Sequence, residues 1–367
     1  MKSKACYGKL GAWGLMLVWQ LASAHSEPVV LPVNIPASSV PERNIHHIDT
    51  LNIHDPAILA DPVSKKYYVY DSFHYGHPQE NLDAPNKRAG VEAYWSDDLI
   101  SWHGPKLIYD IEPDSWAQSE HAPWAPEVAY YQDKYYLFLT FHHYHNILEV
   151  QDGRPPMVTR GSQILVGDSP LGPFKRFSNQ SHTPANEMAL DGTLWIEDGQ
   201  PWMIYCQEWI QTGAGLFKAI RLTSDLSGTI GQPITLFSAA DADWTARTTR
   251  FDGKDIEAVV SDGPWPYMSK TGQLMLLWSS WNKDKSKAYT TSIAFSDNGK
   301  LSGNWTQRNE PLISGDRGHG NIFTTFDGQL MMALHRYFKQ PHTRLQIFKM
   351  EDMGNDLQMS KQVLGHP

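Results

Sequence analysis

Cysteine is scarce in this sequence: the 367 residues include two, Cys6 and Cys206. Cys6 lies in an N-terminal segment that we predict to be removed, which leaves Cys206 without a partner. An internal disulfide bond is therefore excluded from the mature chain, although the compartment predicted below would permit one. Stability must come from a large apolar core, and a hydrophobic content of 41% is enough for one.

Positive charge is also in short supply, with 31 Lys and Arg against 40 Asp and Glu and a formal charge of −9. This balance argues against nucleic acid or an anionic membrane surface as a partner. The sequence has no Cys/His cluster with the spacing of zinc ligands and no glycine-rich phosphate loop. We therefore expect no required cofactor. The sequence indicates no oligomeric state.

Long apolar runs are absent except at the N-terminus. Lys2, Lys4 and Lys9 precede the run "LGAWGLMLVWQLASA", which ends in the small-x-small form of a signal-peptidase site. The alternative is a membrane anchor, but the run is too short to span well and no charged stop follows it. We predict a signal peptide over residues 1–24, export to the periplasm or the medium, and no membrane association after cleavage.

Capped amphipathic helices are few, whereas aromatic residues are abundant at 12%, with 14 Trp and 16 Tyr. Residues 25–49 are rich in Pro and Ser and read as an extended arm. From about residue 50 the chain consists of short β-type runs that each follow a turn signal. The most regular of these runs are "KKYYVYDSF", "DKYYLFLTF", "GQPWMIYCQEW", "GQLMLLWSSW" and "GQLMMALHRYF".

These five runs belong to a repeat. Another short strand precedes each one, in "HDPAILADP", "WAPEVAYYQ", "LDGTLWIED", "SDGPWPYMS" and "GHGNIFTTF". The key positions Asp55, Trp124, Asp191, Asp262 and His319 follow one another at intervals of 69, 67, 71 and 57 residues, by subtraction of their numbers. Repeats of this length with four strands each predict an all-β, five-bladed propeller over residues 50–367. The alternative is a sandwich of unrelated hairpins.

A propeller would gather these key positions at one mouth of its central channel. The ends of the second strands should join them there, namely Asp71, His142, His143, Glu208, Trp281 and His335. Carboxyl groups in an aromatic-lined depression suit glycoside hydrolysis, in which one carboxylic acid protonates the leaving oxygen and one carboxylate activates water.

The motifs "HDPAIL", "WAPEV", "SDDLISW", "SPLGPF", "DGTLWIEDGQPWMIYCQEW", "SDGPWPYMSKTGQLMLLWSS" and "GHGNIFTTFDGQL" together resemble glycoside hydrolase family 43 over residues 50–345. The resemblance implies a five-bladed propeller and an inverting, mostly exo-acting enzyme. Its substrates would be arabinosyl, xylosyl or galactosyl linkages in oligosaccharides or polysaccharide side chains. It also implies that Asp55 is the general base and that Asp191 modulates the pKa of the general acid.

The general acid is open between two residues. The family usually has a glutamate in an "EGP"-like stretch, but this sequence reads "SDGP" with Asp262. Aspartate is one methylene shorter, and catalysis depends on accurate placement. Glu208 in "CQEW" is the favoured acid on reach, with Asp262 binding a sugar hydroxyl; in the alternative, the two roles are exchanged.

Further residues are expected to bind the sugar, although core packing is the competing interpretation for any single tryptophan. The candidates are His54, Trp124, Glu127, Trp209, Trp265, Trp281, His319 and His335. By the same resemblance, a structural calcium ion is allowed near His319. Calcium prefers oxygen ligands, so one histidine does not imply it.

Two other functions compete with this one. A glycoside hydrolase of the family 117 type has five blades and acts on anhydrogalactose units of agar. A non-catalytic sugar-binding propeller would keep the aromatic residues and lose an acid, and the departure at Asp262 keeps this alternative open. The long stretches at residues 77–95 and 143–161 favour a walled pocket and exo action.

Overall fold

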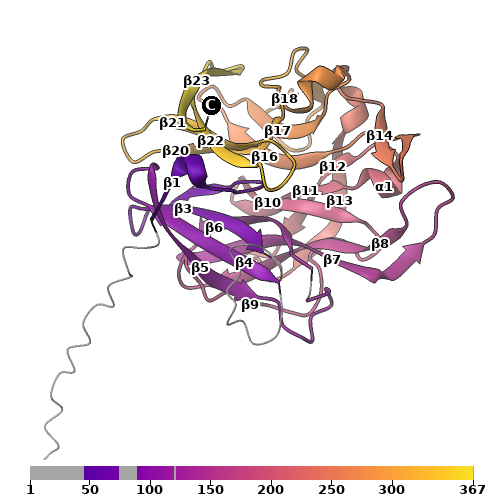
Figure 1. Ribbon diagram of the computed structural model, residues 1–367, viewed down its shortest axis with the longest axis horizontal. Helices are drawn as coiled ribbons and strands as arrows, with labels where there is room; N and C mark the ends of the chain where they lie inside the picture. The colour runs from indigo at the N-terminus through magenta and orange to yellow at the C-terminus, as the bar shows by residue number, and fades with distance from the viewer. Residues whose placement is uncertain (1–44, 74–88, 120, 367) are drawn as a thin grey trace, which may run out of the picture. The chain divides into compact units, whose positions relative to one another are not determined.

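The computed structural model describes residues 45–73, 89–119 and 121–366. The predicted signal peptide and most of the predicted arm lie outside these ranges. Five antiparallel sheets surround a common axis, so the predicted five-bladed β-propeller is confirmed (Figure 1). The α-helix α1 (Trp209–Thr212) has four residues, and no helix in the described ranges could span a bilayer.

Blade 1 has five strands in the order β1-β5-β4-β3-β2, and β2 is nearest the axis. Their bounds are β1 (Ile45–His47), β2 (Ile58–Ala60), β3 (Tyr67–Phe73), β4 (Gly90–Ser96) and β5 (Ser101–Asp110). β1 pairs with β5 at the outer edge, within the stretch predicted as an arm. The 3-10 helix η2 (Ile48–Thr50) then leads toward β2.

Blades 2 and 3 have four strands each, in sequence order from the axis outward. Blade 2 consists of β6 (Trp124–Tyr131), β7 (Lys134–Glu149), β8 (Met157–Gly167) and β9 (Lys175–Arg176). Blade 3 consists of β10 (Ala189–Glu197), β11 (Gln200–Gln207), β12 (Leu216–Leu222) and β13 (Thr229–Ser238). The 3-10 helix η3 (Ala239–Asp241) and the hairpin of β14 (Thr248–Phe251) and β15 (Lys254–Glu257) connect blade 3 to blade 4.

Blades 4 and 5 repeat the four-strand order. Blade 4 consists of β16 (Asp262–Met268), β17 (Leu274–Trp281), β18 (Tyr289–Ser296) and β19 (Trp305–Gln307), with the 3-10 helix η4 (Lys285–Lys287) before β18. Blade 5 consists of β20 (Arg317–Thr324), β21 (Leu330–Arg336), β22 (Arg344–Asp352) and β23 (Leu357–Gly365).

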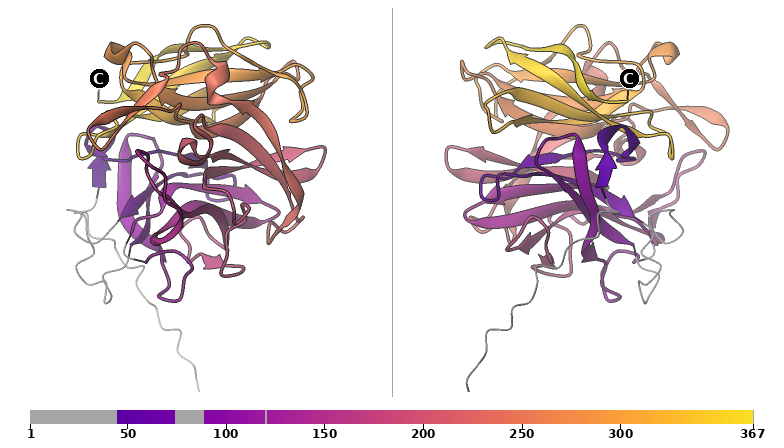
Figure 2. Two further views of the ribbon diagram at one scale, coloured as in Figure 1. Left: turned by 90° about the vertical axis from the view of Figure 1, so that its right-hand side faces the viewer. Right: turned by 60° about the vertical axis from the view of Figure 1, so that its left-hand side comes forward.

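The middle strands are buried on both faces because each blade packs against its neighbours. Val91 of blade 1 and Leu137 of blade 2, for example, belong to one apolar cluster and are fully buried. This packing explains why runs such as "LMLLWSSW" are apolar throughout and do not alternate with polar residues. Figure 2 shows blade 5, in yellow, against the indigo strands of blade 1, and one cluster joins Val69 to Ile347 across this junction.

Each blade begins with a residue in the left-handed backbone region, and these five residues mark the true repeat. They are Asp55 (φ 52°), Ala125 (φ 44°), Asp191 (φ 55°), Gly263 (φ 57°) and His319 (φ 51°). In blades 2 and 4 the predicted key positions Trp124 and Asp262 come one residue earlier, so the predicted repeat was out of register there. The structural repeat is set by a backbone turn, which alanine and glycine can also supply, and not by a polar side chain.

Candidate active site

Five carboxyl side chains line one pocket of about 710 Å³ at the mouth of the propeller. They are Asp55 and Asp71 from blade 1, Asp191 and Glu208 from blade 3, and Asp262 from blade 4. Trp124, His54 and His319 also line it. The structure therefore brings together the five key positions and both carboxyl groups expected from the second strands, Asp71 and Glu208. The other second-strand residues expected there do not line the pocket: His142, His143, Trp281 and His335.

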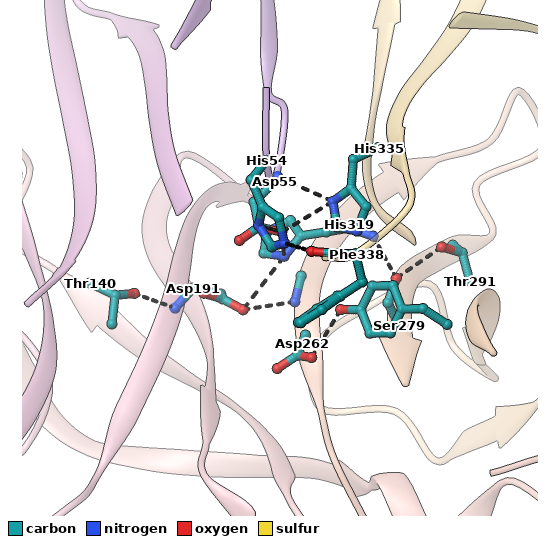
Figure 3. A network of polar contacts seen from close by, with 12 residues as sticks. His54, Asp55, Thr140, Asp191, Asp262, Ser279, Thr291, His319, His335 and Phe338 are labelled. Carbon is teal, nitrogen blue, oxygen red and sulfur yellow. Dashed lines mark hydrogen bonds and ion pairs between the residues drawn. The ribbon is translucent and has the colours of Figure 1, made fainter. Parts of the chain in front are cut away.

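Asp55 lies among three histidines (Figure 3). Its Oδ1 is 2.9 Å from Nδ1 of His54, 3.2 Å from Nδ1 of His319 and 3.3 Å from Nδ1 of His335. Burial alone would raise the pKa of Asp55, but its contacts with His319 and His54 hold it well below its usual range. Asp55 is therefore an ionised carboxylate at neutral pH.

His54 carries the positive charge that pairs with Asp55. Its Nε2 donates a hydrogen bond to the carbonyl oxygen of Phe338 at 3.0 Å. Burial opposes protonation, but Asp55 and Asp71 outweigh it and raise the pKa of His54 to about 9. His335 differs, because burial lowers its pKa to about 4 and its Nδ1 accepts the Asp55 N–H at 3.2 Å.

Asp191 holds the start of blade 4. Its Oδ2 accepts a hydrogen bond from the Gly263 N–H at 3.0 Å, and its own N–H donates to Oγ1 of Thr140 at 2.8 Å. Burial, followed by the nearby carboxyl groups of Asp262 and Asp55, raises the pKa of Asp191 well above its usual range. Because Gly263 follows Asp262 directly, Asp191 fixes the backbone beside that residue.

Asp262 has the properties of a carboxyl group that keeps its proton near neutral pH. Burial raises its pKa to about 7, and the carboxyl groups of Asp55 and Glu208 act in the same direction. The hydroxyl of Tyr289 donates to its Oδ2 at 2.9 Å and opposes this rise. An acid with a pKa near the working pH is well suited to donate a proton.

Glu208 has different surroundings, because it forms a buried ion pair with Arg160. The two side chains are 9% and 4% exposed. The Arg160 guanidinium also stacks on the Trp124 ring at 4.3 Å from its centroid. Loss of the Glu208 carboxylate would leave the Arg160 charge buried without a partner, which is costly.

Five of the predicted sugar-binding residues are not among those that line the pocket. Glu127 and Trp265 face the axial channel, where Oγ1 of Thr193 donates to Glu127 at 2.8 Å. Trp209 packs beside Met188 and Ile210. The remaining two lie behind the pocket wall, where Trp281 contacts Tyr289 and Phe338, and where His335 stacks on His54 and Tyr289.

Sequence reasoning missed three residues of the site: Arg160, Tyr289 and Phe338. Arg160 and Tyr289 lie at or near the start of the third strands β8 and β18, which begin on the same face as the pocket. The residues predicted for this mouth all come from the first two strands of each blade. Arg160 and Tyr289 could have been predicted by including the starts of the third strands, because these strands begin on the same face of the propeller as the pocket.

A calcium ion near His319 would depend on the donor atoms that the surrounding residues offer. In the described residues, one group is compact enough to hold a metal ion: His54, Asp55 and His335. It offers two imidazoles and one carboxylate, whereas calcium requires mainly oxygen ligands. Both nitrogens of His54 are already engaged by Asp55 and Phe338. These residues do not fit calcium, and we derive no catalytic step through a metal.

Comparisons with known proteins agree with this fold and pocket. The sequence profile of Glycosyl hydrolases family 43 matches residues 47–354. The solved structure of an endo-arabinase from Bacteroides thetaiotaomicron VPI-5482 is 34% identical with a TM-score of 0.70, over 83% of this chain and 96% of that one. No curated protein matches the chain.

More distant solved structures share the fold. An endo-1,4-beta-xylanase from Bacteroides thetaiotaomicron VPI-5482 is 21% identical with a TM-score of 0.62, over 86% of this chain and 97% of that one. An alpha-L-arabinofuranosidase from Lactobacillus brevis is 17% identical with a TM-score of 0.61, over 84% and 96%. The profile match covers most of the chain and includes every carboxyl group of the pocket. The predicted resemblance is therefore confirmed, and the chain belongs to glycosyl hydrolases family 43.

Proposed function

We propose that this protein is an inverting glycoside hydrolase that cleaves arabinosyl linkages, with Asp55 as general base and Asp262 as general acid. The observation that carries the proposal is the contrast between these two carboxyl groups in one pocket. The pKa of Asp55 lies well below its usual range and that of Asp262 is raised to about 7. Two carboxyl groups in opposite protonation states are what acid–base hydrolysis requires.

The proposed reaction is a single displacement. Asp55 takes a proton from a water molecule while the water oxygen attacks the anomeric carbon. Asp262 gives its proton to the glycosidic oxygen as the bond to the leaving group breaks. The product has the inverted configuration, Asp55 ends protonated, and Asp262 ends ionised. Asp191 positions Asp262 through its bond to the Gly263 N–H.

The choice of Asp262 reverses the order of preference that the sequence suggested. Glu208 is committed to Arg160, whereas Asp262 is bound by the neutral hydroxyl of Tyr289. Asp262 also occupies the "EGP"-like stretch in which the family has its acid. In this proposal Glu208 contacts the substrate and is held in place by Arg160, and Trp124 provides a flat apolar surface for a sugar ring.

The choice of arabinose is supported by the relative that is 34% identical to this chain and is described as an endo-arabinase. Release of reducing sugar from arabinan, arabinoxylan, arabinogalactan and agar oligosaccharides tests it. We expect release from the arabinose-containing substrates. Release from agar alone would indicate the family 117 type of activity, and no release from any substrate would favour a sugar-binding propeller. Exo action remains a prediction, and the product lengths from linear arabinan test it.

Two matched variants test the acid. Asp262→Asn should lose about 10²–10⁴-fold in kcat/KM on an arabino-oligosaccharide and far less on an aryl arabinofuranoside with an activated leaving group, which needs no protonation. Glu208→Gln should reduce kcat/KM on both substrates to a similar extent. If Glu208→Gln alone shows the selective loss, Glu208 is the acid. Proton NMR of the first product tests inversion, which a retained configuration would refute.

A further inference from the structure

A second cavity lies on the other side of α1 from the catalytic pocket. Its volume is about 660 Å³, and its charged lining residues are Arg154, Arg247 and Glu257. Three separate segments meet here: the connection between β7 and β8, the end of α1, and the region around the β14–β15 hairpin (Figure 1). None of its lining residues lines the catalytic pocket.

The two arginines of this cavity are held by backbone atoms. Nη2 of Arg154 donates to the carbonyl oxygen of Glu257 at 2.7 Å. Arg247 donates from Nη1 to Ala240 at 2.8 Å and from Nη2 to Ala242 at 3.2 Å. Arg154 is half-buried and Arg247 is exposed, and these bonds orient their guanidinium groups. A guanidinium has five N–H donors, so most of the donors stay free.

Neither arginine is neutralised within the described part of the chain. No ion pair there includes Arg154 or Arg247, whereas the neighbouring Arg250 pairs with Asp255 at 3.1 Å. Glu257 contributes one negative charge to the lining, which leaves a local excess of positive charge. This excess stands out in a protein whose formal charge is −9.

One edge of the cavity lies near one edge of the catalytic pocket. Glu208 lines the catalytic pocket and Gly213 lines the second cavity, and the four residues of α1 lie between them. At about 1.5 Å per residue this separation is roughly 7 Å along the helix. The same backbone that carries Arg154 continues into β8 and Arg160, the partner of Glu208.

We propose that Arg154 and Arg247 form a distal subsite for a negatively charged substituent of the glycan, a uronic acid carboxylate or a sulfate ester. Two guanidinium groups oriented by backbone carbonyls can bind the oxygens of such an anion through charge-assisted, paired hydrogen bonds. The preferred substrates would then be acidic, branched glycans. This inference rests on the proposed glycosidase function and narrows its substrate class.

Three oligosaccharides with the same arabinosyl backbone test the subsite: one with a glucuronic acid branch, its carboxyl-reduced twin, and one with a sulfated branch. We expect kcat/KM to be about tenfold or more higher for at least one charged substrate than for the neutral twin, through a lower KM. Higher salt should reduce this ratio. The charged substrate that is favoured identifies the anion.

Variants of the two arginines locate the effect. Arg154→Met and Arg247→Met should each remove most of the preference, and Arg154→Lys should restore less than half of it, because lysine keeps the charge but loses the planar fork. Arg250→Met is the matched control, since Arg250 is near the cavity but does not line it. It should keep the preference. Circular dichroism and thermal unfolding confirm that each variant is folded.

The outcomes separate this inference from the proposed function. Equal kcat/KM on charged and neutral substrates, with normal hydrolysis of an aryl arabinofuranoside, would overturn the subsite alone. A preference that survives in both methionine variants would also overturn it. No hydrolysis of the aryl arabinofuranoside by the wild type would instead overturn the proposed function.

Discussion

At the residue scale, Tyr289 sets one limit of the pH range for activity. Because the proposed acid needs its proton, kcat/KM should fall as the pH rises through about 7, the pKa of Asp262. The hydroxyl of Tyr289 stabilises the ionised form of Asp262. Tyr289→Phe should therefore raise that pKa and move the fall in activity to higher pH. A pH–rate profile on an arabino-oligosaccharide measures the shift.

The control for this prediction is Tyr267→Phe. Tyr267 also donates to a carboxylate, Oδ2 of Asp352 at 2.9 Å, but does not line the pocket. Its variant should have the wild-type profile. A Tyr289→Phe profile that coincides with the wild type would argue against Asp262 as the acid.

Glu127, in the axial channel, is also a buried carboxyl group with a raised pKa, and this shift should affect the stability of the fold. Burial raises the pKa of Glu127 to about 8, against the opposing hydrogen bonds of Thr193 and Leu194. The pKa of Glu127 in the folded state lies above its value in the unfolded state. Its contribution to the free energy of unfolding is therefore full below about pH 4.5 and is lost as the pH rises toward about 8. Glu127→Gln should remove this dependence.

Urea unfolding at pH 5.5, 7.0 and 8.5 tests the prediction for Glu127. Between the extremes, the free energy of unfolding of the wild type should fall by about 2–4 kcal/mol more than that of Glu127→Gln. The exposed Glu310→Gln variant serves as the control and should follow the wild type. Parallel curves for wild type and Glu127→Gln would show that Glu127 is not the buried neutral acid.

At the element scale, the ion pair of Arg160 and Glu208 joins β8 of blade 2 to the start of α1 in blade 3. Arg160→Met would leave a buried carboxylate without a partner, at an expected cost of about 3–5 kcal/mol in the free energy of unfolding. The double variant with Glu208→Gln should lose less, because no charge is stranded. Urea unfolding of both variants makes the comparison, and equal losses would contradict it.

The sequence predicted elements better than it predicted their exact register. "GQLMLLWSSW" is β17 because its apolar residues are covered by neighbouring blades on both faces. The sequence did not predict the β14–β15 hairpin. The repeat unit that contains it, from Asp191 to Asp262, is close in length to the first two units and so gave no sign of an insertion. The order of Glu208 and Asp262 could not be read from the sequence, because it depends on Arg160 and Tyr289, which are 48 and 27 residues away.

At the scale of the whole molecule, Asn321 adds a pair of hydrogen bonds to the contacts that close the ring between the last blade and the first. Oδ1 of Asn321 accepts the Ile58 N–H at 3.0 Å, and its Nδ2 donates to the Ile58 carbonyl at 2.9 Å. Asn321→Leu would leave both buried backbone groups unpaired, so we expect a loss of about 2–4 kcal/mol in the free energy of unfolding.

Urea unfolding measures the loss at Asn321, and the exposed Asn309→Leu provides the control, with an expected change within about 0.5 kcal/mol. Similar values for the two variants would mean that apolar packing alone, in the cluster of Ile58 and Phe323, closes the ring. The number of blades was predictable from the repeat, but this closure was not, because the partners are 263 residues apart.

The left-handed turn at the head of each blade also limits what substitutions the protein can accept there. Ala125 and Gly263 occupy it without any functional group, so the turn does not depend on the catalytic roles proposed for its counterparts. Asparagine and aspartate adopt this conformation readily, whereas β-branched residues do so poorly. Ala125 also lines the proposed catalytic pocket, so a single substitution there could add a carboxyl or amide group to the pocket without changing the backbone turn.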